Sequence, residues 1–159
     1  MNKLNKTESI SFEDEVKLLK YIRELYKESI IKKKRLYTYI TKAIFRSATD
    51  DKKVKYVSKA ALIEAKKRGI DLSKMTWTNQ TKVDKKRKVF HYEHCNPIKE
   101  LREAVLDTSE DINKIIKRDI TCWILKKENR KLDKKYKAKR PNGWKKCYAE
   151  CKIEVFNNK

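Results

Sequence analysis

Two adjacent side chains, Glu93 and His94, have the chemical types that hydrolysis of a phosphodiester bond requires. They precede Pro97 in the sequence Glu-His-Cys-Asn-Pro, at the end of a stretch rich in β-branched and aromatic residues. A carboxylate can hold a divalent metal, and an imidazole can accept a proton from water at neutral pH. His91 is the only other histidine, and regular alternation along a strand places it on the face of Glu93 and opposite His94. Glu93 and His94 are therefore the candidate centre of a hydrolytic site.

The charge of the chain indicates a polyanionic partner. Its 159 residues include 43 Lys and Arg against 22 Asp and Glu, a formal net charge of +21, and the excess is spread along the whole chain. Such a surface attracts a long polyanion and repels itself when none is bound. No apolar run approaches the ~18 residues that span a bilayer, and no signal-peptide core follows the N-terminus. We therefore expect no membrane association and a cytoplasmic location.

The cysteines do not have the spacing of a metal site. Cys95, Cys122, Cys147 and Cys151 form no pair of C-x-x-C motifs, so a structural zinc is not expected. A disulfide framework is not expected either, because nothing indicates secretion. Reduced, partly buried thiols are the prediction.

The first part of the chain has the pattern of a small helical unit. Ser11 with Asp14 begins a helix whose apolar residues recur at helical spacing, and Gly69 suits the end of another. We predict helices from residue 11, over residues 34–46 and from residue 58 to Gly69, with the following side chains inward in the first two: Val16, Leu19, Ile22, Tyr26, Leu36, Ile40, Ala43 and Ile44. The predicted unit covers residues 1–74, and a second part covers residues 75–159 within one compact molecule.

The second part mixes strand and helix patterns. Strands are predicted over residues 88–94, 120–124 and 144–156, because each stretch is rich in β-branched or aromatic residues or alternates. Helices are predicted over residues 98–106, after a Thr108–Asp111 capping box, and over residues 126–136. Residues 140–143 form a turn. The chain is therefore predicted to be an α+β protein with a C-terminal strand.

The order of strand, Glu-His-x-x-Pro, strand and helix resembles the His-Me finger endonucleases, also called HNH or ββα-metal nucleases, over roughly residues 89–135. The resemblance implies that Glu93 is a metal ligand, that His94 is the general base and that Asn129, on the last helix, is the second ligand. It implies Mg²⁺, with Mn²⁺ as an alternative, and DNA, double-stranded in the first instance, as substrate. Ile120 or Asp119 lies where the family commonly has a bracing Asn. Restriction, phage, homing and nicking roles all suit such an enzyme, and double-strand cleavage would require a homodimer or two nicks.

Cations near this centre are predicted to contact DNA. The basic runs at residues 85–88 and 137–140 flank it, and the N-terminal helices, with the run at residues 32–35 between them, are predicted to clamp the duplex. The residues assigned to phosphate are Arg87, Lys88, Arg130, Lys131, Lys139 and Arg140.

Three other interpretations stay open. The first is a non-catalytic, basic nucleic-acid-binding protein, for example one associated with the ribosome. The second is a PD-(D/E)xK nuclease that uses Glu150 and Lys152, with Asp133 or Asp119 upstream. In the third, Glu93 and His94 form a surface ion pair at a strand end and Asn129 is a solvated helix residue.

Overall fold

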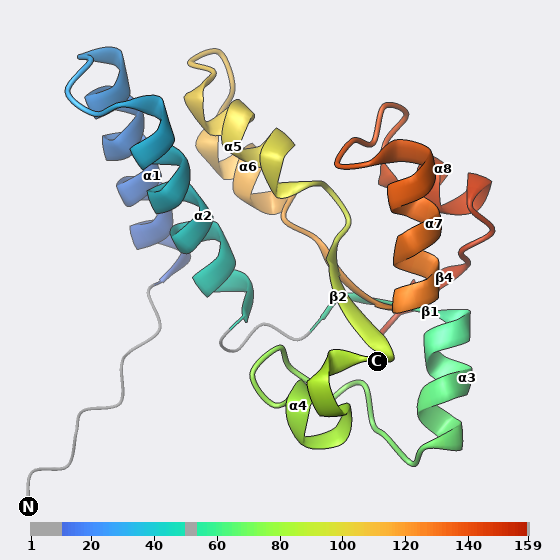
Figure 1. Ribbon diagram of the computed structural model, residues 1–159. Coiled ribbons are helices and arrows are strands. Elements are labelled where there is room, and N and C mark those ends of the chain that lie inside the picture. The colour runs from blue at the N-terminus through green and yellow to red at the C-terminus, as the bar shows by residue number, and fades with distance from the viewer. Residues whose placement is uncertain (1–10, 50–53, 159) are drawn as a thin grey trace, which may run out of the picture.

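The computed structural model describes residues 11–49 and 54–158. It combines helices with a four-stranded sheet, which confirms the α+β class (Figure 1). The helices are α1 (Phe12–Lys27), α2 (Lys33–Thr49), α3 (Lys59–Lys67), α4 (Gln80–Val83), the 3-10 turn η1 (Lys85–Arg87), α5 (Ile98–Leu106), α6 (Ile112–Lys117), α7 (Lys126–Tyr136) and α8 (Trp144–Glu150). The strands are β1 (Tyr56–Ser58), β2 (Phe90–His94), β3 (Thr121–Leu125) and β4 (Val155–Asn157).

Capping residues begin and end several helices as predicted. The Ser11 hydroxyl accepts a hydrogen bond from the backbone N–H of Asp14 at 3.2 Å, and Ser58 caps α3 in the same way. Gly69 follows α3 with a φ of +65°, a conformation that glycine adopts without strain. The cap of α6 is Asp111 alone.

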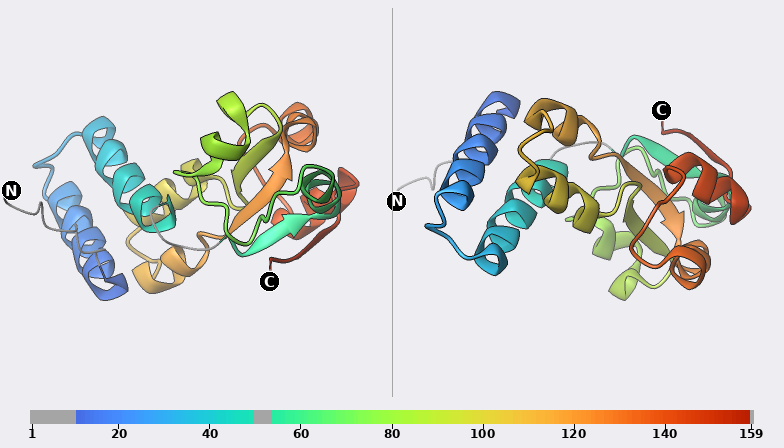
Figure 2. Two further views of the ribbon diagram at one scale, coloured as in Figure 1. Left: turned by 90° about the horizontal axis from the view of Figure 1, so that it is seen from below. Right: turned by 90° about the horizontal axis from the view of Figure 1, so that it is seen from above.

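A first core lies among four helices. α1 and α2 pack against α5 and α6, which the chain inserts between β2 and β3 (Figure 2). The buried guanidinium of Arg23 on α1 donates to the carbonyls of Val105 at 2.7 Å and Glu110 at 2.7 Å, which attaches α1 to the end of α5. The expected inward residues Val16, Leu19, Ile22, Leu36 and Ile40 are buried and Tyr26 is half-buried, whereas the side chains of Ala43 and Ile44 lie outside the described part.

The sheet has the strand order β2-β3-β1-β4. β2 runs antiparallel to β3, with Glu93 opposite Cys122 and His94 opposite Thr121. β1 runs parallel to β3 and antiparallel to β4. All five residues of β3 are buried, as expected for a strand covered on both faces.

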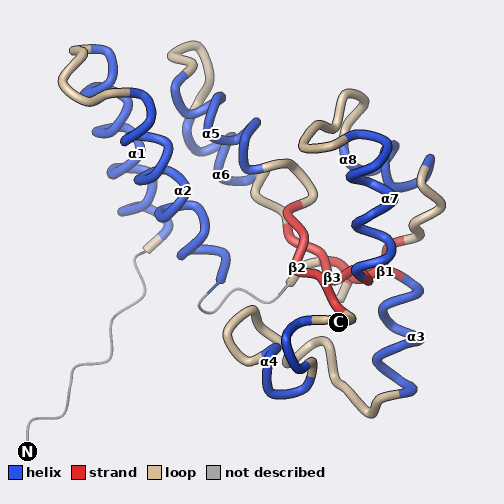
Figure 3. Tube along the Cα trace, in the orientation of Figure 1, coloured by secondary structure: helices blue, strands red, loops and turns tan. Residues whose placement is uncertain are grey.

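An apolar core lies on each face of the sheet, whose strands are drawn in red among the surrounding helices in Figure 3. On one face, α3 and the loop after it pack on Phe90, Tyr92 and Trp123. On the other, α7 and α8 pack on Cys122 and Ile124. The helix α7 follows β3 without a loop, so β2, β3 and α7 form a ββα unit.

The structure differs from the predicted organisation in two places. The boundary at residue 74 matches neither core, because β1 pairs with β3 and β4 while α5 and α6 pack with α1 and α2. The strand predicted over residues 144–156 is mostly the helix α8, and only β4 at its end is extended. Trp144, Cys147 and Tyr148 lie on one face of α8 because their spacing of three and four residues is also helical.

Candidate active site

β2 places Glu93 and His94 on opposite faces of the sheet. The His94 ring lies 5.5 Å from the ring of Tyr92, in edge contact, on the face covered by α3. Oε2 of Glu93 lies 3.0 Å from Nε2 of His91, within hydrogen-bond distance, on the face covered by α7 and α8. Because side chains alternate along a strand, adjacent residues cannot share a site unless the strand bends. The structure therefore does not bring the predicted pair together.

His94 instead pairs with Asp119. Nδ1 of His94 lies 2.8 Å from Oδ1 of Asp119, and the two side chains are 8% and 6% exposed. The loop between α6 and β3 that carries Asp119 is held against the end of β2. Asn96 donates to the Arg118 carbonyl at 2.6 Å, and the Cys95 N–H donates to the Ile120 carbonyl at 2.8 Å. Asp119 is one of the two residues that the resemblance left open as a brace, and it contacts His94 directly.

The contact with Asp119 determines which ring nitrogen of His94 carries the proton in the neutral imidazole. An ionised carboxylate only accepts hydrogen bonds, so the proton in the contact with Asp119 belongs to Nδ1 of the imidazole. In the neutral ring the other nitrogen, Nε2, then carries the lone pair. A carboxylate that holds a histidine in this way fixes its tautomer and stabilises the imidazolium that forms on proton uptake.

Tyr92 borders this pair. Burial raises the pKa of Tyr92 to about 12, a hydrogen bond with Thr121 offsets part of the rise, and the negative charge of Asp119 adds to it. The phenol is therefore protonated at neutral pH. Tyr92 contributes an apolar ring edge to the surroundings of His94, not a negative charge.

Glu93 is held by an ion pair. Its Oε1 lies 2.8 Å from Nη2 of Arg140, and the side chains are 12% and 3% exposed. Arg140 also donates to the carbonyls of Lys137 and Lys139. Glu93 therefore attaches the segment between α7 and α8 to β2.

Asn129 lies on α7 and donates its amide to Asp133, one turn later, at 3.0 Å. Both carboxylate oxygens of Glu93 already have partners, Arg140 and His91. Within residues 11–49 and 54–158, no three His, Cys, Asp or Glu side chains gather closely enough to hold a metal ion. In this arrangement the two implied ligands, Glu93 and Asn129, each contact other protein groups.

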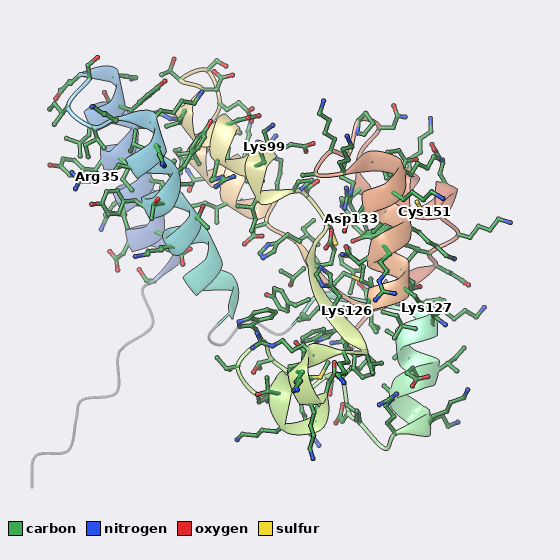
Figure 4. The ribbon with its side chains drawn as sticks, viewed as in Figure 1. Arg35, Lys99, Lys126, Lys127, Asp133 and Cys151 are labelled. Carbon is green, nitrogen blue, oxygen red and sulfur yellow. The ribbon has the colours of Figure 1, made fainter. Side chains whose placement is uncertain are left out.

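The cations assigned to DNA differ in availability. Lys88, Arg130, Lys131 and Lys139 are exposed. Arg87 is half-buried and stacks on Trp77, and Arg140 is buried in its ion pair with Glu93. Exposed cations also occur on both parts of the molecule, with Arg35 on α2, Lys99 on α5 and Lys127 on α7 visible in Figure 4.

Glu150 and Lys152 do not have the geometry of the alternative nuclease motif, which needs both on one face of a strand. Glu150 ends α8 and accepts hydrogen bonds from Lys135 and from the hydroxyl of Tyr136, and these two contacts hold the pKa of Glu150 below its usual value. Lys152 lies in the following turn with a φ of +57°. The structure therefore gives this alternative no support.

A pocket beside α5 is acidic and does not suit a polyanion. Its polar lining consists of Asn96, Glu100, Glu103, Asp107, Glu110 and Arg118. Arg118 pairs with Glu110 at 2.9 Å. We assign this pocket no role in DNA contact.

Two residues near β2 gave little signal in the sequence. Asp119 lies 25 positions from His94, and the sequence named it only as one of two candidates for a bracing residue. Asp84 precedes a basic run and is buried, with several backbone N–H groups as donors. Only the fold shows that these carboxylates point inward.

Within the described residues, no helix is both long enough and apolar enough to cross a membrane. No family model matches the sequence, and neither the curated proteins nor the solved structures give a match.

Proposed function

We propose that the protein hydrolyses phosphodiester bonds in DNA, with His94 as the general base and Asp119 as the residue that orients it. The observation that supports this most is the 2.8 Å contact between Nδ1 of His94 and Asp119, at the end of β2 in a ββα unit. A His that is held by a carboxylate can take a proton from water at neutral pH, whereas Lys or Arg would need a large shift in pKa. The net charge of +21 attracts the substrate.

The remaining assignments follow from the placement of each residue. Exposed Arg130, Lys131, Lys88 and Lys139 neutralise phosphates, and a homodimer or two sequential nicks would give double-strand cleavage. Dependence on Mg²⁺ or Mn²⁺, which the resemblance to His-Me finger nucleases implies, stays a prediction, because other protein groups hold Glu93 and Asn129. A reducing, intracellular location accords with four buried free cysteines.

A second function has an observation in its favour. His94 is only 8% exposed, and Glu93 neutralises a buried Arg. Both residues would then serve the fold, and the protein would bind nucleic acid without cleaving it. Cleavage assays separate the two functions because binding alone leaves plasmid DNA intact.

The test is nicking of supercoiled plasmid with Mg²⁺, with Mn²⁺ and with EDTA. We expect His94→Ala to abolish cleavage and Asp119→Asn to lower its rate by about 10²- to 10⁴-fold, the range in which an orienting carboxylate acts. His91→Ala is the matched control, since it removes the other histidine from the opposite face of β2. Equal loss in both histidine variants, or activity that survives in His94→Ala, would remove His94 from its role. Cleavage of RNA but not DNA would overturn the assignment of substrate.

A further inference from the structure

A short basic turn before β2 is held by a buried carboxylate. The turn consists of Lys85, Lys86, Arg87 and Lys88, and we call it the basic turn. Asp84, which is 3% exposed, accepts hydrogen bonds from the backbone N–H groups of Lys88 at 3.0 Å and of Phe90 at 2.9 Å, and Val89 donates to it as well. The amide of buried Gln80 donates to the same carboxylate at 3.1 Å and to the Phe90 carbonyl at 2.9 Å.

The backbone of the basic turn is in an unusual conformation. Lys86 and Arg87 have φ values of +59° and +50°, a region in which a Cβ atom crowds the backbone. Two consecutive non-glycine residues there are uncommon, and such strain persists only where surrounding contacts determine it. Here the Arg87 N–H donates to the Asp84 carbonyl at 2.8 Å, and the Asp84 carboxylate holds the backbone that follows from Lys88 to Phe90. The turn is therefore rigid, unlike the solvated lysine run that its sequence suggests.

Arg87 is fixed as well. Its guanidinium lies 3.4 Å from the centre of the Trp77 ring, and Nη2 donates to the Trp77 carbonyl at 2.8 Å. Stacking holds the guanidinium at a defined place while it keeps its charge. Lys85, Lys86 and Lys88 are exposed around it.

The basic turn lies on the same face of the sheet as His94. Trp77 is in edge contact with Tyr92 at 6.0 Å between ring centroids, and Tyr92 is in edge contact with His94 at 5.5 Å. Tyr92 belongs to the core on the α3 side and Trp77 packs against it, whereas Glu93 contacts His91 on the opposite face of β2. A strand that contacts Arg87 can therefore continue toward His94 without crossing the sheet.

We propose that the basic turn is a preformed clamp for the sugar–phosphate backbone of the DNA strand that is cleaved at His94. The inference rests on the proposed function for the identity of the strand. Four consecutive cations suit a polyanion, and their rigid backbone means that little conformational entropy is lost on binding. Asp84 serves as a positioning residue that never touches DNA, and Arg87 contacts a phosphate directly.

Asp84→Asn tests the clamp because charge and geometry predict opposite results. Removing a negative charge raises the affinity of a polyanion if only net charge matters. If the turn must be held in shape, affinity falls. We expect about a tenfold weaker Kd for a fluorescent DNA duplex, measured by anisotropy in the His94→Ala background so that no cleavage occurs. Glu154→Gln, which removes an exposed carboxylate next to β4, is the matched control and should bind as tightly as the parent or slightly better.

Arg87→Gln tests the clamp independently, in case the Asp84→Asn protein does not fold. It should weaken binding about tenfold at 0.1 M salt and lower the slope of log K against log salt by about 1, the effect of one lost phosphate contact. Lys99→Gln, on α5, is the matched control, because it also removes one positive charge from the surface. Equal affinities in Arg87→Gln and Lys99→Gln, or tighter binding by a folded Asp84→Asn, would overturn the clamp.

The outcomes also separate the clamp from the proposed function. Weakened binding in the clamp variants with no cleavage by the unmodified protein would overturn the nuclease and keep the clamp. Cleavage that depends on His94, together with unchanged binding in the clamp variants, would keep the nuclease and overturn the clamp. A protein that binds no DNA at all would overturn both.

Discussion

Glu93→Ala distinguishes a structural carboxylate from a metal ligand. The substitution leaves the Arg140 side chain, which is 3% exposed, without its carboxylate at 2.8 Å. Breaking a buried ion pair from one side costs about 3–5 kcal/mol, because the other charge stays buried. Arg140 keeps the carbonyls of Lys137 and Lys139 as acceptors, so the lower end applies, and we expect a loss of about 3 kcal/mol in the free energy of unfolding.

Thermal and urea unfolding measure this loss. For a protein of this size, 1 kcal/mol shifts Tm by about 2–4 °C, so Glu93→Ala should melt about 6–12 °C lower. The double variant Glu93→Ala/Arg140→Ala should lose less than the sum of the single losses, since neither charge is then left alone. A Glu93→Ala protein that melts like the unmodified one but loses metal-dependent cleavage would refute this reasoning and assign Glu93 to the metal.

Three further predictions concern other parts of the molecule. Ser58→Ala removes both the cap of α3 and the hydroxyl that donates to buried Glu128 at 2.6 Å, so urea unfolding should show a loss of about 2–3 kcal/mol, and an unchanged midpoint would contradict these roles. The pKa of Tyr92 is about 12 in the folded protein and 10.0 in an ordinary tyrosine, so its contribution to stability is complete below pH 10 and is lost as the pH rises toward 12. The free energy of unfolding of Tyr92→Phe should therefore fall less steeply over this range than that of the unmodified protein, and identical profiles would contradict the raised pKa. All four cysteines are buried, and a hydrogen bond with Cys95 together with burial raises the pKa of Cys122, so a thiol reagent should label the native protein only as fast as it opens; rapid labelling without denaturant would refute their burial.

Local signals predicted most elements of the fold. The caps at Ser11 and Ser58 begin α1 and α3, and the helices α5 and α7 have the predicted bounds. These features depend on neighbours in the sequence, where capping and hydrophobic period act. The sequence did not predict β1, because this strand has only three residues and its last residue, Ser58, is also the cap of α3. Its parallel pairing with β3 depends on contacts between residues far apart in the chain, which no local pattern reports.

The candidate site was predicted in part. The sequence indicated His94 and named Asp119 as one of two candidates for a bracing residue, and the structure brings the two side chains into contact. It also indicated that His91 shares a face with Glu93, which the contact at 3.0 Å confirms. The assignment of Arg140 to DNA depended on its position in a basic run, and composition does not reveal that one cation of such a run turns inward to a carboxylate 47 residues away. Buried partners of this kind are set by the packing of α7 and α8 on the sheet.

The most direct test of the account is plasmid nicking by the unmodified protein, His94→Ala and His91→Ala, side by side in Mg²⁺. The two histidines differ by three positions and lie on opposite faces of β2, one held by Asp119 and the other by Glu93. We expect cleavage by the unmodified protein and by His91→Ala, and none by His94→Ala. Cleavage by folded His94→Ala, or its absence from all three proteins in both Mg²⁺ and Mn²⁺, would contradict the assignment of His94 as the general base of a DNA endonuclease.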